Sequence, residues 1–254
     1  MQANDIHDVL QILDGIIAEC KAASDPLGYF PALYRQVTLK VKQGIAAGFF
    51  DNGPQMDRFD ALFANRYFAA YDAFRSGGQP SKSWQVAFQF TRSGQLIILQ
   101  DLLVGINAHI NLDLGVAAGE NFQGQALQDF RGDFDKINDI LAGLIPPVKA
   151  VLAQFSPLLG ILEKIGGRDA VEVLDFSMEA ARDDAWLHAQ LLSLQPPALW
   201  PLTVRTLDRK VAFLGRVIAQ PIGLVANAVR IIRDTESKDV PAIIDALNSI
   251  VPSS

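Results

Sequence analysis

Residues 96–119 read LIILQDLLVGINAHINLDLGVAAG, and this stretch decides the fold of the chain. It is apolar around its whole circumference, which is typical of a helix buried inside a protein. It nevertheless carries six polar or charged side chains, namely Gln100, Asp101, Asn107, His109, Asn111 and Asp113. Buried polar groups need hydrogen-bond partners. We therefore expect other helices to surround this one and to supply those partners.

The polar side chains form two clusters on this helix. At about 100° per residue, His109 and Asp113 lie roughly 40° apart on one face. Gln100, Asn107 and Asn111 lie on nearly the opposite face. A carboxylate beside an imidazole can orient the ring and raise its basicity, or the two groups can share a metal ion. The histidine–carboxylate pair is therefore the first indication of function.

Helical periodicity dominates the rest of the chain, and no run alternates as a strand would. The predicted helices span about 5–22, 31–48, 57–75, 82–91, 95–117, 125–143, 148–164, 168–193, 201–219, 221–234 and 239–250. Predicted breaks include Pro146-Pro147 and Gly166-Gly167. The connections are short, which favours neighbouring antiparallel helices. We predict a single all-α domain over residues 1–254, a multi-helix bundle around a buried central helix at about 95–117, with one candidate seam at 194–201.

Composition excludes several classes of protein. The net charge is −6 and no long basic run is present, which argues against a nucleic-acid partner. Cys20 is the only cysteine, so neither an intramolecular disulfide nor a cysteine-based zinc site can form. We expect a cytoplasmic protein, because this cysteine usage fits a reducing compartment. The first helix also carries acids where an export signal would carry basic residues.

Two segments, 96–119 and 211–232, are long enough to raise the question of a membrane span. Both carry charged or strongly polar residues, which are costly inside a bilayer, so buried helices are the better interpretation. Basic residues near the second segment leave peripheral membrane association as a weak alternative. Packing against the core explains its apolar residues equally well, so membrane association is not our expectation.

Several short motifs follow one another in an order that resembles a known family. They are LYRQVT at 33–38, FFD at 49–51, FANRYFAAYDA at 63–73, SWQVAF at 83–88, INAHINLDL at 106–114, DFDKIND at 133–139 and RDDAWLHA at 182–189. Together they resemble an uncharacterised family of bacterial and fungal proteins classed only as a domain of unknown function. The Asn-Ala-His-Ile-Asn-x-Asp-Leu core is the most specific part. The resemblance supports one domain over most of 30–190 and implies no activity, substrate or catalytic residue.

A metal ion would need ligands beyond His109 and Asp113. The chain has only two other histidines, so the further ligands would be carboxylates, with Asp133 as the first candidate and Asp60 as the second. An oxygen-rich site with one histidine suits Mg²⁺, Mn²⁺ or iron better than structural zinc. No HExxH motif is present. The alternative is that His109 and Asp113 only satisfy one another inside the core.

Arg182 and Trp186 share a broad helix face and form a second constellation. An arginine on that face needs a carboxylate partner, for which Asp175 and Asp113 are the candidates. One interpretation is a clamp for the carboxylate or phosphate of a substrate. The other is a buried ion pair beneath a core tryptophan.

Four further side chains are candidates for contacts with a substrate. They are Asn107, Asn111, Tyr67 and Trp186. Each has a structural alternative, because asparagines four residues apart often bridge helices and buried aromatic side chains usually belong to the core.

The sequence thus favours an enzyme that acts on a small, largely hydrophobic metabolite. His109 would be the general base or a metal ligand, Asp113 would orient it or share the metal, and Arg182 would hold an anionic group. The alternative is a non-catalytic helical module that binds an apolar ligand or a partner helix. A weaker alternative is magnesium-dependent chemistry on a prenyl diphosphate, through the acids Asp129, Asp133, Asp135 and Asp139.

Overall fold

The computed structural model describes residues 1–166 and 170–250, and every regular element in these ranges is helical. The prediction of an all-α fold is confirmed. The α-helices are α1 (Ile6–Ala22), α2 (Tyr29–Ala46), α3 (Gly53–Arg75), α4 (Lys82–Arg92), α5 (Ile98–Ala108), α6 (Gly115–Asn121), α7 (Gln125–Phe155), α8 (Gly160–Gly166), α9 (Ala170–Ser193), α10 (Trp200–Ala219), α11 (Gly223–Thr235) and α12 (Val240–Asn248). Short 3₁₀ turns lie at Pro26–Gly28 and Pro197–Leu199.

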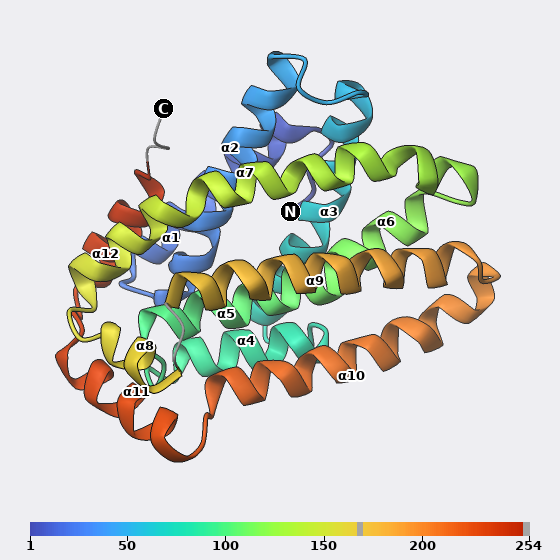
Figure 1. The fold of residues 1–254 in the computed structure, drawn as a ribbon. Coiled ribbons are helices and arrows are strands. Elements are labelled where there is room, and N and C mark those ends of the chain that lie inside the picture. The colour runs from blue at the N-terminus through green and yellow to red at the C-terminus, as the bar shows by residue number, and fades with distance from the viewer. Residues whose placement is uncertain (167–169, 251–254) are drawn as a thin grey trace.

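The central helix is continuous from Ile98 to Asn121, but its middle is not α-helical. Residues His109–Leu114 form a π-helical segment between α5 and α6. This helix contacts α2, α3, α4, α9 and α10, and Figure 1 shows it crossing the molecule behind α9. It is long and apolar enough to cross a membrane, yet 78% of an apolar 18-residue stretch of this helix is buried inside the protein. We therefore assign it as the core helix that the sequence predicts.

Two glycines bring α9 unusually close to the central helix. A Cβ atom at Gly115 would lie 2.5 Å from the carbonyl oxygen of Ala185, and one at Gly119 would lie 2.8 Å from that of Ala189. Only glycine permits such an approach of two backbones. The contact fixes α9 against α6 and sets the position of Arg182, one turn before Ala185.

Helix α7 corrects one prediction. The sequence predicts a break at Pro146-Pro147, whereas a single helix runs from Gln125 to Phe155 and contains both prolines. Proline inside a helix removes a hydrogen bond and clashes with the preceding turn. Here the buried side chains around the prolines, among them Leu144, Ile145 and Val148, hold the helix in place. The chain leaves the helix only at Ser156.

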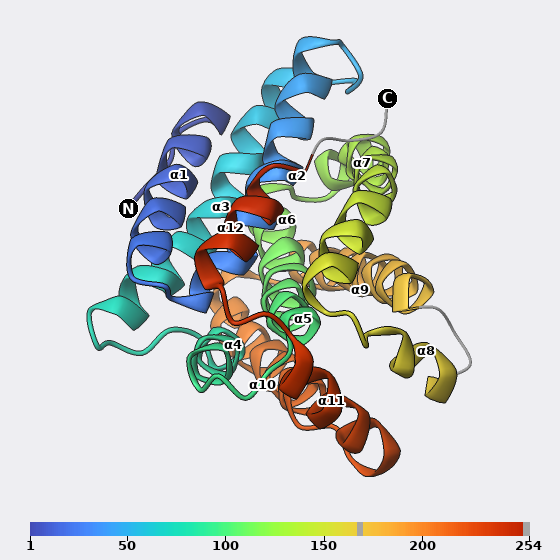
Figure 2. The ribbon, with the colours of Figure 1, turned by 90° about the vertical axis from the view of Figure 1, so that its left-hand side faces the viewer.

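The remaining helices pack around this centre. Helix α7 contacts α2, α9 and α12, and α12 also contacts α1 and α2. Figure 2 shows α10 and α11 along the side opposite α1 and α2. The elements on either side of 194–201 both contact the central helix, α9 through α6 and α10 through α5.

Candidate functional site

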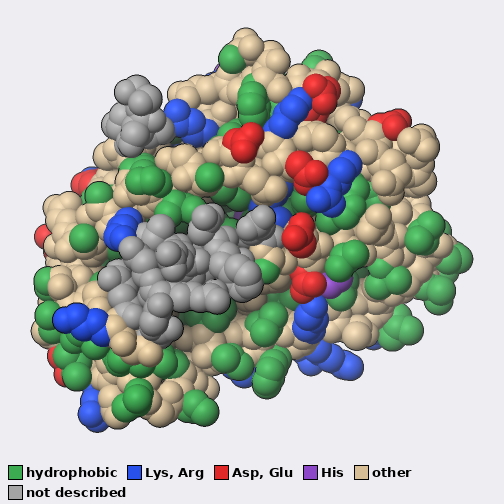
Figure 3. Space-filling view, viewed as in Figure 1, with side chains coloured by type: hydrophobic (Ala, Val, Ile, Leu, Met, Phe, Trp, Pro, Cys, Tyr) green, Lys and Arg blue, Asp and Glu red, His purple; other side chains and the backbone are tan. Residues whose placement is uncertain are grey.

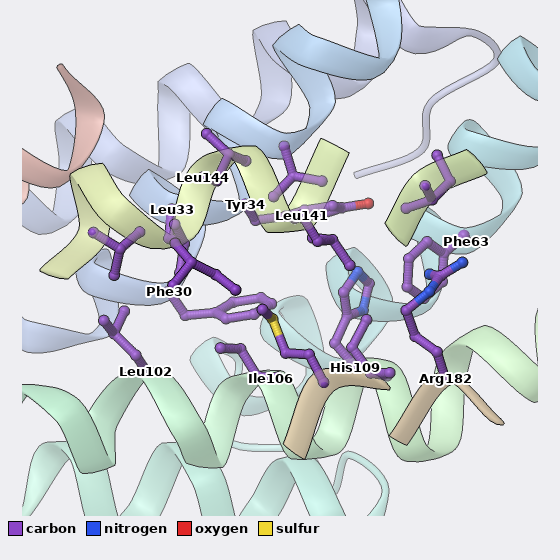
Figure 4. Close-up of a pocket in the computed structure, with 16 residues that line it drawn as sticks. Phe30, Leu33, Tyr34, Phe63, Leu102, Ile106, His109, Leu141, Leu144 and Arg182 are labelled. Atoms are coloured by element: carbon purple, nitrogen blue, oxygen red, sulfur yellow. The ribbon is translucent and has the colours of Figure 1, made fainter. Parts of the chain in front are cut away.

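A cavity of about 100 Å³ lies beside the central helix, between α2, α3, α5, α7 and α9. Its polar lining consists of His109, Arg182 and the hydroxyl-bearing ring of Tyr34. The other lining residues are apolar: Phe30, Leu33, Val37, Phe63, Leu102, Ile106, Ile110, Ile137, Leu141, Leu144, Ile145, Val148 and Met178. Figure 4 shows His109 and Arg182 at the same end of the cavity, close to Phe63. Its volume is of the same order as that of the roughly 150 Å³ apolar cavity that holds benzene, so it suits a small molecule.

His109 stands at the start of the π-helical segment, and aromatic rings enclose it. Its ring stacks on Phe63, with the centroids 3.8 Å apart and the planes 11° from parallel, and it meets Tyr34 edge-on at 4.5 Å. The side chain is only 2% exposed. Burial lowers the pKa of His109, while the hydrogen bond and charge of Asp113 oppose that shift. The imidazole is therefore neutral at neutral pH.

Asp113 pairs with His109 but does not line the cavity. Nδ1 of His109 is 3.5 Å from Oδ2 of Asp113, so the pair that the spacing predicts faces one another. The carboxylate has two further partners, because Trp84 donates from Nε1 over 2.7 Å and Arg66 donates from Nε over 3.2 Å. Nε2 of His109 is buried and has no hydrogen-bond partner. The ring thus has one nitrogen toward a carboxylate and one without a hydrogen-bond partner.

Arg182 is a buried arginine that bonds neutral groups. It is 3% exposed, and its Nε and Nη2 donate to the side-chain oxygen of Asn138 and the carbonyl of Phe134. Its guanidinium also lies over the ring of Phe134, 4.4 Å from the centroid. Burial lowers the pKa of Arg182 to about 10, so the group stays charged at neutral pH.

Neither carboxylate expected beside Arg182 is seen to pair with it. Asp113 bonds Arg66 instead, and the side chain of Asp175 lies outside the described residues. Asp135 acts on Arg182 through its charge, yet its carboxylate pairs with Arg131. Among the described side chains, none gives Arg182 a carboxylate at ion-pair distance. A desolvated guanidinium in this state is well placed to receive an anion.

The four predicted substrate contacts lie elsewhere, and the structure gives each a packing role. Asn107 donates to the carbonyl of Val211 in α10, and Asn111 donates to the side-chain oxygen of Asn107. Asn107 therefore bridges two helices, and Asn111 supports it from within the central helix. Tyr67 is buried against Phe30 and Trp84, outside the lining of the main cavity. Trp186 packs on Phe134 and also does not line it.

The predicted metal set of His109, Asp113 and Asp133 is not assembled. Asp133 accepts hydrogen bonds from the backbone N–H groups of Asp51 and Asn52, over 2.7 Å and 2.9 Å. Its pKa is lowered because these bonds and Lys136 outweigh the effect of its burial. Asp133 thus anchors the start of α3. Among the side chains that the structure describes, no three His, Cys, Asp or Glu residues are grouped to hold a metal ion.

The other acidic candidates also stand apart from the cavity. Asp60 is buried, and burial raises its pKa to about 7. On α7, Asp129 accepts from Gln125 and Asp135 pairs with Arg131. None of the four acids proposed for a diphosphate site lines the cavity. Their placement gives the prenyl-diphosphate hypothesis no support.

Sequence reasoning missed three residues that shape the site. Phe63 stacks on His109, Tyr34 lines the cavity with a hydroxyl that has no partner, and Trp84 holds Asp113. All three belong to the short motifs quoted for the family resemblance. Their membership in those motifs was the available signal, but their roles depend on contacts between distant helices.

Comparison with known proteins supports the resemblance at the level of the family. No curated protein and no solved structure gives a significant match to the chain. A model of a family of unknown function matches residues 6–221, which include the cavity and all the site residues described above. The chain belongs to this family, DUF5995.

Proposed function

We propose that this protein is an enzyme that holds a small, largely apolar organic acid in the cavity and moves a proton at His109. One observation carries the proposal. The Nε2 atom of His109 is buried without a hydrogen-bond partner, in a side chain that lines a largely apolar cavity. Buried polar atoms are almost always hydrogen-bonded, so an orphan nitrogen at a cavity indicates a place for a ligand atom.

The environment of His109 suits a general base. Its lowered pKa keeps the ring neutral and able to accept a proton at neutral pH. With the Nδ1 hydrogen toward Asp113, the lone pair of Nε2 is free to receive that proton. The carboxylate of Asp113 then stabilises the imidazolium that forms. Trp84 and Arg66 hold Asp113 in position.

The residues that line the cavity support one class of substrate. The buried guanidinium of Arg182 suits the carboxylate of a substrate, and the apolar side chains suit a short hydrocarbon tail. A water molecule needs two to four polar partners to be held in a cavity. With His109 and Arg182 engaged by the substrate, only Tyr34 remains among the polar lining residues to hold one. This favours proton abstraction from carbon, with isomerisation as the net reaction, over hydrolysis.

A second candidate is a carrier that binds the same acid without reaction. The distance of 3.5 Å between His109 and Asp113 favours it, because Asp113 is closer to Trp84 and Arg66 than to the imidazole. The carrier would use Arg182 and the apolar wall, and His109 would only accept a hydrogen bond.

Proton exchange in D₂O tests the enzyme without knowledge of the net reaction. 2-Oxohexanoate has a short apolar tail, a carboxylate and acidic hydrogens next to its ketone. We expect the protein to accelerate exchange of those hydrogens, followed by ¹H NMR. His109→Gln should slow the exchange by about 10²–10⁴-fold, the usual contribution of a general base. Arg182→Met should raise the concentration needed for half-saturation, and Arg182→Lys should restore part of the loss.

Binding is measured on the same samples by isothermal titration calorimetry. Saturable binding that depends on Arg182, without accelerated exchange, would refute the enzyme and support the carrier. Absence of both binding and exchange would refute both. Equal exchange by the parent and by His109→Gln would exclude His109 as the base.

A further inference from the structure

The bend between α10 and α11 exposes a group of large apolar side chains. We call Phe213, Leu214, Val217, Ile222, Leu224 and Val225 the apolar elbow. Ile222 is 87% exposed, Leu224 71% and Phe213 63%. The two helices meet at an angle of 65°. Packing against the core accounts for Val211, Ala228 and Ile232, as predicted for the segment 211–232, but it does not account for the elbow.

The exposed apolar surface continues along α10. At about 100° per residue, Leu202, Phe213 and Val217 share one side of the helix, and all three are exposed. The opposite side, with Val211 and Gly215, is buried against α4 and α5. Figure 3 shows hydrophobic side chains gathered along the lower and right-hand edges, where α10 and the α9–α10 connection lie in Figure 1.

Positive charge accompanies this surface in a chain whose net charge is −6. Residues 197–235 contain six basic and two acidic side chains. One of the acids, Asp208, is buried, and its carboxylate accepts the N–H groups of Lys82 and Ser83. Arg209, Arg216 and Arg230 are exposed and form no ion pair within the described part of the chain. The outward charge around the elbow is therefore positive.

We propose that the apolar elbow and the arginines beside it dock this protein on the surface of an anionic lipid bilayer. Helices that lie in a membrane interface combine an exposed apolar face with flanking lysine or arginine, and anionic lipids strengthen their binding. The elbow inserts Ile222, Leu224 and Phe213 among the acyl chains, while Arg209 and Arg216 contact lipid phosphates. This proposal is independent of the reaction at His109.

The charge distinguishes a bilayer from a second copy of this chain. A two-fold dimer through the elbow would place the same patch on both partners. Arg209 and Arg216 of each copy would then face like charge. An anionic bilayer instead complements both the apolar and the basic parts.

Cosedimentation of the full chain with lipid vesicles tests the proposal. We expect binding to vesicles of phosphatidylcholine mixed with phosphatidylglycerol, weaker binding in high salt, and little binding to phosphatidylcholine alone. Arg209→Gln with Arg216→Gln should lower the partition coefficient about 25-fold, at about fivefold for each positive charge removed. Phe213→Ser with Ile222→Ser should lower it at least about tenfold.

The matched control is Leu62→Ser, which changes a 41% exposed leucine on α3 and should bind like the parent. Parent protein that stays in the supernatant with the mixed vesicles would overturn the proposal. So would equal loss of binding in the control. A dimer in solution that Phe213→Ser dissociates would overturn it in favour of a second copy as the occupant.

Discussion

Replacement of Asp60 by asparagine should flatten the pH dependence of the free energy of unfolding between about pH 5 and about pH 8. Burial raises the pKa of Asp60 from 3.8 to about 7 in the folded protein. The folded state then holds this proton more tightly than the unfolded state. The protonated Asp60 side chain therefore favours the folded state at low pH. This contribution to the unfolding free energy is lost as the pH rises through the folded-state pKa. The folded-state pKa of about 7 lies about two units above pH 5. At about 1.4 kcal/mol per unit, the parent protein loses about 2.5 kcal/mol of unfolding free energy over this range.

Urea unfolding of the parent and of Asp60→Asn at several pH values measures this effect. The asparagine brings a buried N–H₂ group that can cost about 1–3 kcal/mol at every pH, so the informative quantity is the change between pH values. We expect the difference in unfolding free energy, variant minus parent, to rise by about 2.5 kcal/mol from the low to the high pH. Asp139→Asn, on an exposed aspartate, is the control and should show no such change. Parallel curves for the parent and Asp60→Asn would refute the reasoning.

Two further substitutions test the packing that positions the site. Gly119→Ala should lower the unfolding free energy by about 1–3 kcal/mol, because its Cβ would lie 2.7 Å from Cβ of Leu192. Gly143→Ala, with open space around its Cβ, should raise it by up to about 1 kcal/mol, and equal effects in thermal unfolding would contradict the close approach. Pro146→Ala should raise it by about 2 kcal/mol, because the N–H group that proline lacks is restored, and the greater freedom of the unfolded chain offsets only part of this gain. An unchanged or lower melting temperature would contradict that account.

Periodicity predicted the helices well because most of them bury one face. The central helix was recognisable because its composition is apolar on all sides, and burial of its middle follows from that. The predicted helix break at Pro146-Pro147 is wrong because the prediction relies on the low helix propensity of proline. In the structure, tertiary contacts at Leu144 and Val148 keep this segment helical. The exposed elbow was missed for a related reason, since an apolar residue in a sequence does not reveal whether another element covers it.

The candidate site was predictable only in part. The spacing of His109 and Asp113 placed them side by side, and the helix face of Arg182 marked it as buried. Their convergence on one cavity depends on how α9 packs on α6, which the sequence signalled only through two glycines. Asp133 was assigned to a metal site because its side of α7 is buried, yet its partners are backbone N–H groups from a distant loop. Helical periodicity in the sequence does not predict hydrogen bonds to the backbone of a distant loop.

The π-helical segment gives the strongest argument that the cavity is more than a packing defect. Such segments are rare and occur frequently at functional sites. Here the segment begins at His109 and includes Asp113, the two residues whose contacts are most specific. A packing defect in an apolar core needs neither an irregular helix nor a buried imidazole with a free nitrogen. Their coincidence with a buried guanidinium that donates to Asn138 and Phe134 supports the proposal that this cavity holds a ligand.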